Sequence, residues 1–406
     1  MSFFKQPYYK VLRNFARSIG RWPDQSRLQT FLIGVVIISA FILNLTPIIT
    51  ADVVHFDDQQ LIFETIGSLL TNAATLTVYF NTFLNGKKLK VLFERINDDW
   101  KLVTNRREIM ILKKYAKLGS FISAGYAGFV YMATFTFVIE PALPMMINFI
   151  FKTNISAPYN FSCPMEWVII DKRKYYWILF TNSTVCVMLI LSVLISCDVI
   201  FITFVHHACS LFAIAGYRIK NLPTDVNFNN KPTESYLLRN SHDVYYIHLV
   251  SSIKIHRRAL EYFNLIESTF TLGIGVVVFL NVPLMSITGV QLIVQTNTLQ
   301  QKIKLMMFAV AQIIHLFFEC FLSQQLTDMS LKIQRHIANG KWYNISKKSQ
   351  KLLILMTLRS QVPCILTAGK IMDLSIESFG MVVEAVIQNV YHRHYDVYKR
   401  GSLHCK

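Results

Sequence analysis

The chain has 406 residues, of which 53% are hydrophobic, and its mean hydropathy is +0.37. A soluble domain rarely averages such apolar values, so the composition favours a multi-spanning membrane protein. The net charge of +17 would suggest a nucleic-acid partner in a soluble chain, but no basic run interleaved with aromatic residues is long enough to support one, and cytoplasmic loops rich in Lys and Arg explain the charge better.

The first 27 residues predict a basic amphipathic segment. Its apolar stripe comprises Leu12, Phe15, Ile19 and Trp22. The other face carries Lys10, Arg13, Arg17 and Arg21. Such a helix lies in the headgroup plane of a membrane, with its apolar side toward the acyl chains and its cations toward anionic lipid. A solvated tail is the alternative.

Six apolar segments follow, and each is long enough to cross a bilayer as a helix. They are residues 28–51, 61–86, 117–139, 175–217, 263–295 and 303–326. The fourth is about twice as long as a membrane requires, so we expect its helix to continue into the cytoplasm, with Asp198 marking where it leaves the lipid.

Lys and Arg indicate the orientation. They cluster in the amino-terminal segment and in the second–third, fourth–fifth and sixth–seventh connections, whereas the first–second and fifth–sixth connections carry almost none. The positive-inside rule therefore predicts a cytoplasmic amino terminus, although residues 172–174 add cations to the outer third–fourth connection. That connection holds two sequons, so Asn154 and Asn160 are predicted glycosylation sites. With seven spans the carboxyl terminus is extracellular, which inverts the topology of a G-protein-coupled receptor.

The seventh apolar segment, residues 352–391, is the most polar of the set. It carries Arg359, Lys370, Asp373, Glu377 and Glu384. A charge at mid-bilayer costs about 2.5–3.5 kcal/mol, so this segment is expected in the protein interior or along a water-filled path. A stripe of small and polar residues supports both interpretations: a cation path lined by that stripe, and a buried helix whose carboxylates pair with Lys370 or Arg359. The stripe comprises Ser375, Ser378, Val382, Ala385 and Asn389.

The sequence contains no nucleophile elbow, zinc-protease motif or phosphate-binding loop, and its cysteines form no Cys-x-x-Cys pair. We therefore expect a protein that is not an enzyme, with no catalytic residues, no metal and no cofactor. A pocket for small apolar molecules is more plausible, because aromatic and hydroxyl residues mix on the outer halves of three spans. The candidate lining residues are Phe63, Leu70, Tyr126, Val130, Thr134, Phe137, Tyr176, Phe180 and Thr184. Ordinary helix packing is the alternative for each of them.

Four stretches, in order along the chain, resemble the insect odorant receptor family, especially its forms in bees, wasps and ants. They are YYKVLRNFARSIGRWPDQS, HRRALEYFNLIESTF, CFLSQQLTDMS and RSQVPCILTAGKIMDLSIESF. The resemblance implies an all-α protein with seven transmembrane helices. Such a protein binds small volatile ligands and gates a non-selective cation channel as a heterotetramer with a shared co-receptor. The expected location is the plasma membrane of sensory dendrites.

The resemblance also implies a division of the chain. It comprises a cytoplasmic segment at 1–27, six helices with the ligand pocket at 28–326, and an anchor, pore helix and tail at 327–406. The residues expected on the pore side are Ser378, Val382, Ala385, Val386, Asn389 and Val390. Members of the family usually end in a short apolar run, whereas residues 391–396 read YHRHYD, so the gate either moves to 386–390 or has an unusual lining. A gustatory-type receptor channel, a G-protein-coupled receptor and a transporter remain the alternatives.

Overall fold

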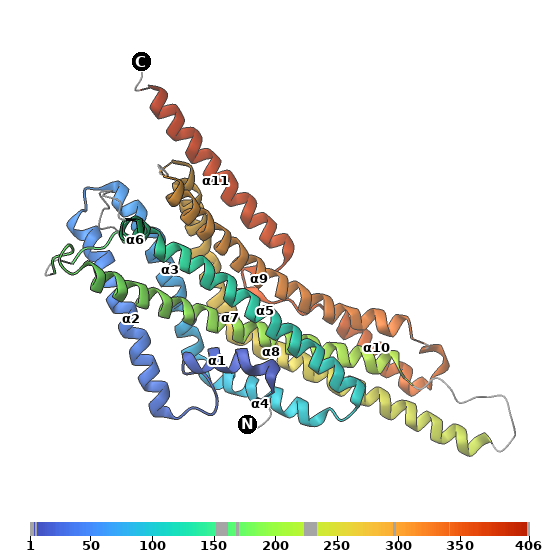
Figure 1. The fold of residues 1–406 in the computed structure, drawn as a ribbon. Coiled ribbons are helices and arrows are strands. Elements are labelled where there is room, and N and C mark those ends of the chain that lie inside the picture. The colour runs from blue at the N-terminus through green and yellow to red at the C-terminus, as the bar shows by residue number, and fades with distance from the viewer. Residues whose placement is uncertain are drawn as a thin grey trace.

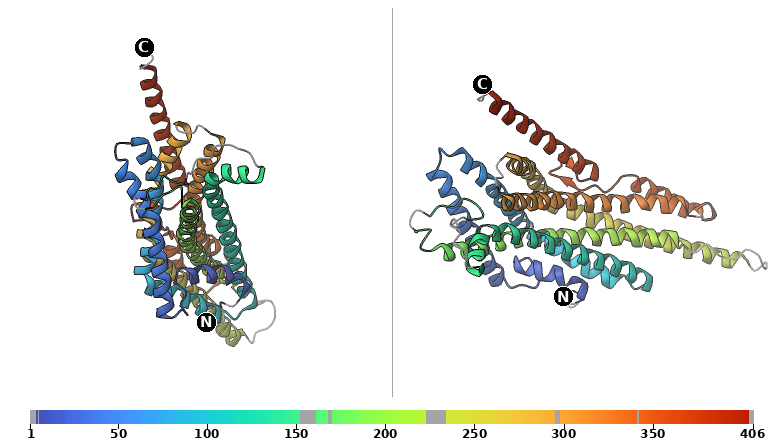
Figure 2. Two further views of the ribbon diagram at one scale, coloured as in Figure 1. Left: turned by 60° about the vertical axis from the view of Figure 1, so that its left-hand side comes forward. Right: turned by 45° about the horizontal axis from the view of Figure 1, so that its top comes forward.

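The computed structural model describes residues 4, 6–151, 161–167, 170–222, 234–294, 298–340 and 342–403. Long helices run side by side in an elongated bundle (Figures 1 and 2). In chain order the helices are α1 (Lys10–Ser18), α2 (Arg27–Val54), α3 (Gln59–Leu84), α4 (Gly86–Leu102), α5 (Arg106–Ile139), α6 (Leu143–Phe151), α7 (Tyr176–Lys220), α8 (Glu234–Val294), α9 (Leu299–Ala338), α10 (Lys347–Ser360) and α11 (Ile376–Leu403). Short 3₁₀ turns lie at Pro7–Tyr9, Glu140–Ala142 and Trp342–Asn344.

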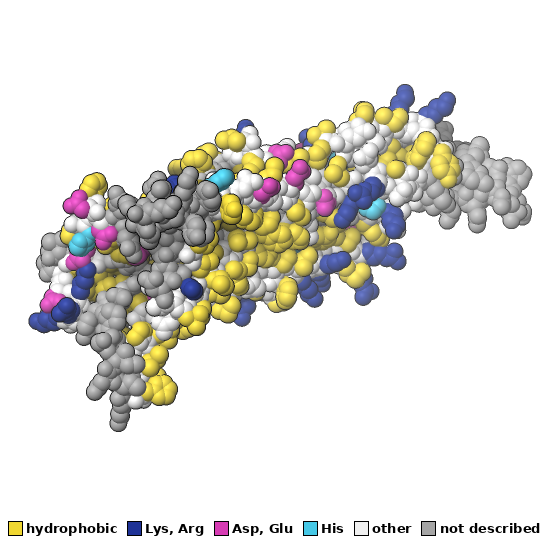
Figure 3. Space-filling model, turned by 90° about the horizontal axis from the view of Figure 1, so that it is seen from above, with side chains coloured by type: hydrophobic (Ala, Val, Ile, Leu, Met, Phe, Trp, Pro, Cys, Tyr) yellow, Lys and Arg dark blue, Asp and Glu magenta, His cyan; other side chains and the backbone are white. Residues whose placement is uncertain are grey.

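Within the described residues, six helical stretches are long and apolar enough to span a membrane. They are Arg27–Val54, Leu61–Leu84, Arg106–Ile147, Tyr176–Lys220, Tyr246–Ile293 and Leu299–Ala338. Each coincides with a predicted span, and several extend well beyond it. Hydrophobic side chains cover the middle of the bundle, and Lys and Arg gather toward the end that carries the α7–α8 and α9–α10 connections (Figure 3). This distribution is that of a membrane protein with a basic end outside the bilayer.

The prediction of residues 352–391 as a single helical span is wrong. Residues 352–391 form α10, then an antiparallel hairpin of β1 (Thr367–Ala368) and β2 (Met372–Asp373), and then α11. Pro363 follows α10 closely, and proline disfavours helical backbone at the residue before it. Gly369 and Lys370 then adopt left-handed backbone at the turn, with φ values of 65° and 60°. Of the charges in this segment, only Glu377 and Glu384 therefore lie on α11.

The hairpin docks on α8 through backbone and side-chain hydrogen bonds. Gly369 N donates to the carbonyl oxygen of Thr271 at 2.8 Å, and the Thr271 hydroxyl donates to the carbonyl oxygen of Thr367 at 2.8 Å. Glu267 Oε1 accepts from the Thr367 hydroxyl at 2.5 Å. This close approach requires a glycine on α8, because a Cβ atom at Gly275 would lie 2.5 Å from Gly369 N. The hairpin thus fixes the start of α11 relative to α8.

Gly275→Ala is expected to destabilise the protein by about 1–3 kcal/mol, since the added methyl group meets backbone that cannot rotate away. Gly125→Ala on α5 is the matched control: a Cβ atom there meets nothing within 4 Å, and alanine is favoured over glycine in a helix by about 1 kcal/mol. Thermal melting of the detergent-solubilised protein should therefore fall for the first variant and stay level or rise for the second. Equal melting temperatures would contradict the docking contact.

The amino-terminal segment packs against other helices of the chain, although we expected it to lie on lipid. The apolar side of α1 packs against α7 and α5, and Leu12 and Ile19 are each only 2% exposed. Trp22 meets Phe4 and Phe93 edge to face, at ring distances of 5.2 and 5.5 Å. The stripe was predicted correctly, but the expectation that it faces acyl chains is wrong, because the neighbouring helices bury it first.

Candidate ligand-binding site

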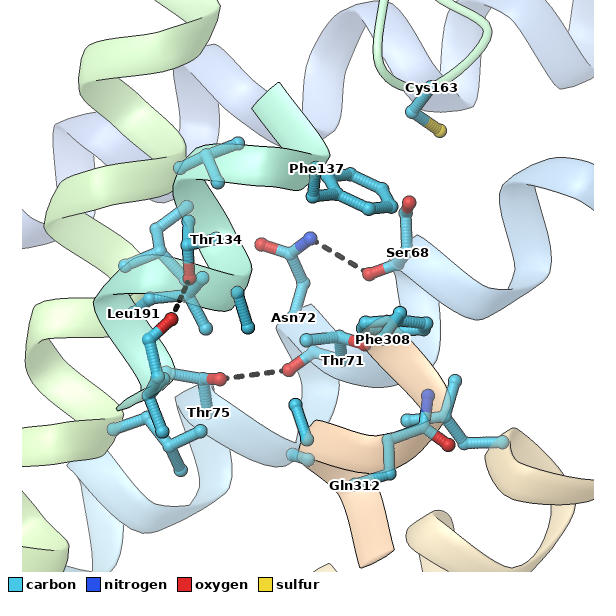
Figure 4. A pocket seen from close by; sticks show the side chains of 18 of the residues that line it. Ser68, Thr71, Asn72, Thr75, Thr134, Phe137, Cys163, Leu191, Phe308 and Gln312 are labelled. Atoms are coloured by element: carbon cyan, nitrogen blue, oxygen red, sulfur yellow. Dashed lines mark hydrogen bonds between the residues drawn. The ribbon is translucent and has the colours of Figure 1, made fainter. Parts of the chain in front are cut away.

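A cavity of about 170 Å³ opens among α2, α3, α5, α7, α8 and α9 (Figure 4). Its walls are mostly apolar and include Val130, Phe137, Leu191 and Phe308. An engineered cavity of about 150 Å³ with a similar apolar lining binds benzene in another protein, so this space suits a small organic molecule.

The threonine hydroxyl groups that line the cavity on α3 and α5 donate within their own helices. Thr71 donates to the carbonyl oxygen of Gly67 at 2.9 Å, and Thr134 donates to that of Val130 at 2.7 Å. Figure 4 shows Thr71, Thr75 and Thr134 around the central space. Because their protons are used locally, these oxygens are left as acceptors toward a ligand.

Four amide side chains at the cavity are buried with one atom unpaired within the described part of the chain. The unpaired donors are Nδ2 of Asn44 and of Asn281, and the unpaired acceptors are Oδ1 of Asn72 and Oε1 of Gln312. Asn72 Nδ2 donates to the carbonyl oxygen of Ser68 at 2.8 Å, and Gln312 Nε2 donates to the Thr288 hydroxyl at 3.1 Å. A buried unpaired polar atom is costly, so each of these four atoms would gain from a hydrogen bond with a molecule in the cavity.

One end of the cavity is closed by a loop. Ser162, Cys163 and Met165 lie there, and Lys304 Nζ donates to the carbonyl oxygen of Ser162 at 2.8 Å. The same ammonium group lies 4.7 Å from the centre of the Phe137 ring. Burial raises the pKa of the Cys163 thiol to about 11, so this thiol is protonated near neutral pH and unreactive.

At the opposite end, helices α5, α7 and α9 are joined by polar contacts. The Tyr126 hydroxyl donates to Asp198 Oδ2 at 2.6 Å, and His315 Nε2 lies 3.5 Å from the same oxygen. Asp198 therefore does not simply mark where α7 leaves the lipid; it faces partners inside the bundle.

A family profile described as "7tm Odorant receptor" matches residues 60–387. The chain belongs to the insect odorant receptor family. Odorant receptor Or2 of Anopheles gambiae is 21% identical over 355 residues, which cover 84% of this chain and 88% of that protein. Odorant receptor 67c of Drosophila melanogaster is 21% identical over 400 residues, 93% of each chain.

Solved structures show the same fold. The insect olfactory receptor OR5 of Machilis hrabei, in complex with eugenol, superposes with a TM-score of 0.75 over 96% of this chain and 97% of that one, at 11% identity. Without the ligand the same receptor gives a TM-score of 0.71. The predicted seven-transmembrane all-α fold is thus confirmed, with α11 as the seventh helix.

In this odorant receptor, four of the predicted ligand-binding residues line the cavity, and all four lie on one face of α5. They are Tyr126, Val130, Thr134 and Phe137. The other five lie outside its lining. Phe63 accepts from Gln291 through its carbonyl oxygen, and Thr184 donates to the carbonyl oxygen of Phe180. Tyr176 is 1% exposed and packs against Phe180 and Phe161.

The polar lining from α3, α8 and α9 was not predicted. A signal was available on α3, where Ser68, Thr71, Asn72 and Thr75 recur at helical spacing within an apolar run. On the other helices, Asn281 and Gln312 are isolated amides in membrane spans, a residue type that usually faces the interior.

The predicted pore residues lie on two sides of α11. Ser378 and Val386 are buried, and Val382 and Val390 pack against the core, so this side faces α8 and α9. Ala385 and Asn389 are exposed, as are Glu377 and Glu384. Among the described residues, neither carboxylate has an ion pair with Lys370 or Arg359. Glu384 accepts instead from Gln388 at 3.3 Å. The predicted glycosylation sites Asn154 and Asn160 lie outside the described residues.

Proposed function

We propose that this odorant receptor binds small volatile molecules in the cavity among α2, α3, α5, α7, α8 and α9. The observation that carries the proposal is an apolar space with buried amide donors and acceptors that find no partner among the described residues. Apolar burial supplies affinity at about 25 cal/mol per Å², and the amides select for a polar group on the ligand. Eugenol, named with the Machilis hrabei receptor, is a small aromatic molecule with a hydroxyl group and has both features.

Ligand binding is proposed to open a non-selective cation channel made as a heterotetramer with a shared co-receptor. The exposed side of α11, with Ala385 and Asn389, is the proposed pore lining, and the packed side, with Ser378, Val382, Val386 and Val390, transmits movement. Gln312 supports this coupling because it borders both the ligand cavity and a second cleft that Val386 and Val390 line. A ligand with higher affinity for the open form shifts the equilibrium toward it.

The proposed topology has a cytoplasmic amino terminus and an extracellular carboxyl terminus, in the plasma membrane of sensory dendrites. Residues 1–27 then form a cytoplasmic segment, 28–326 the ligand-binding helices, and 327–406 the anchor, pore helix and tail. Asn154 and Asn160 are the proposed glycan acceptors on the outer side.

Whole-cell current tests this function. The chain is expressed alone and with the family's shared co-receptor in cells without endogenous receptors, and a panel of volatiles is applied while G-protein signalling is blocked. A fast cation current is expected only in the co-expressing cells, with a ligand profile that the co-receptor alone lacks. Surface expression without any such current would contradict the channel proposal.

A further inference from the structure

Three metal-ligating side chains from two helices meet at the end of the cavity that Tyr126 closes. Asp198 comes from α7, and His315 and Glu319 lie one turn apart on the same face of α9. One donor atom from each of the three lies within 4.8 Å of the other two. Neither ligand binding nor gating, as proposed above, requires this combination of residues.

The donor set and its spacing fit a divalent transition metal. Zn²⁺ binds imidazole nitrogen and carboxylate oxygen at about 2.0–2.2 Å, which puts neighbouring donors about 3.4 Å apart in a tetrahedral site. His315 Nε2 and Asp198 Oδ2 are 3.5 Å apart, so this pair already has the required separation. A carboxylate oxygen of Glu319 lies within 4.8 Å of both donor atoms, so only a small adjustment separates it from the same coordination sphere.

The polar atoms of the cluster are incompletely paired. Glu319 is only 8% exposed, and its Oε2 has no hydrogen-bond partner in the described part of the chain; His315 Nε2 also lacks a hydrogen bond. Asp198 accepts a hydrogen bond from the Tyr126 hydroxyl. In metal sites, such a donor outside the coordination sphere orients the metal-binding carboxylate.

The acidic side chains of the cluster also suit a bound cation. Two carboxylates face one imidazole inside membrane-spanning helices, and among the described residues neither carboxylate has a Lys or Arg ion pair. An ionised carboxylate is costly at this depth unless it is paired or protonated, and a divalent ion coordinated by two carboxylates and a neutral imidazole is one arrangement that makes the group electrically neutral.

We propose that Asp198, His315 and Glu319 form a divalent metal site, with Zn²⁺ as the ion that fits best. Three protein ligands leave one coordination position open. His315 lines the ligand cavity, so the open position faces that space and takes water or a polar group of a bound molecule.

Cobalt binding tests the site directly, since Co²⁺ replaces Zn²⁺ in such sites and absorbs visible light. The full chain is purified from membranes with an affinity tag that contains no histidine, titrated with Co²⁺, and then competed with Zn²⁺. One Co²⁺ per chain is expected. His315→Ala and Glu319→Gln should each weaken binding more than about 10-fold, because even outer-shell changes cost 10–100-fold.

Two further variants keep the test decisive. His55→Ala removes an exposed histidine 3.9 Å from Glu166 and should leave the affinity unchanged. His315→Cys keeps a metal donor, so it should retain binding and add a thiolate-to-cobalt absorption band that a purely structural role cannot produce. No Co²⁺ binding by the wild type, or equal affinity in His315→Ala and His55→Ala, would overturn the proposal. The readout needs no odorant and no current, so its outcome is independent of the proposed channel function.

Discussion

Replacing Asp99 with alanine is expected to lower the stability of the receptor by about 3–5 kcal/mol and to remove most of it from the cell surface. Asp99, near the end of α4, is 1% exposed. Its carboxylate lies 2.8 Å from His207 Nε2 on α7 and also pairs with Arg258 on α8. The substitution leaves an arginine without its counter-charge beside buried helices, which costs more than the pair itself contributes. Thermal melting and surface labelling measure the effect.

Glu94 provides the matched control on the same helix. Its side chain is 45% exposed and pairs with Lys90 one turn away at 3.9 Å. An exposed pair of this kind contributes at most about 0.5 kcal/mol, so Glu94→Ala should melt like the wild type. If Asp99→Ala also melted like the wild type, this network would not hold α4 against α7 and α8.

Ala133→Trp is expected to abolish ligand responses or to raise the half-maximal ligand concentration by more than about 100-fold. Ala133 is 6% exposed and lines the cavity, so the indole occupies space that a ligand needs. Losing about 100–200 Å² of apolar burial weakens binding by about 2.5–5 kcal/mol. Concentration–response curves of the current in co-expressing cells, normalised to surface expression, measure the change.

Met132, the adjacent residue on α5, is 54% exposed and is not part of the cavity lining. Met132→Trp adds the same indole to the same helix, facing the membrane, where tryptophan is accommodated. It should therefore keep the ligand concentration dependence of the wild type. Equal potency of both variants would place the ligand elsewhere.

The sequence was a good guide wherever a local pattern decides the structure. Apolar runs located the six long spans, because a membrane helix requires an uninterrupted run of about 20 apolar residues. The spacing of Tyr126, Val130 and Thr134 put them on one face of α5, and that face lines the cavity. The same reasoning failed at Phe63 and Tyr176, since periodicity groups residues on a face without saying which neighbour that face meets.

Contacts between distant parts of the chain could not be predicted. Asp99 meets His207 and Arg258 across 108 and 159 residues, and Asp198 meets Tyr126 across 72. The break after α10 could have been predicted, because Pro363 and Gly369 are visible in the sequence. The apolar character of residues 352–391 suggested one continuous span instead. The amino-terminal stripe identified an apolar face, but only the fold shows that α7 covers it.

A cryo-electron microscopy map of the receptor with its co-receptor and an activating volatile would show where the ligand binds and which side of α11 lines the pore. We expect ligand density in the cavity, beside Asn72, Thr134 and Gln312, and a central pore to which α11 contributes Ala385 and Asn389. Ligand density at another site, with this cavity empty in the activated complex, would contradict it.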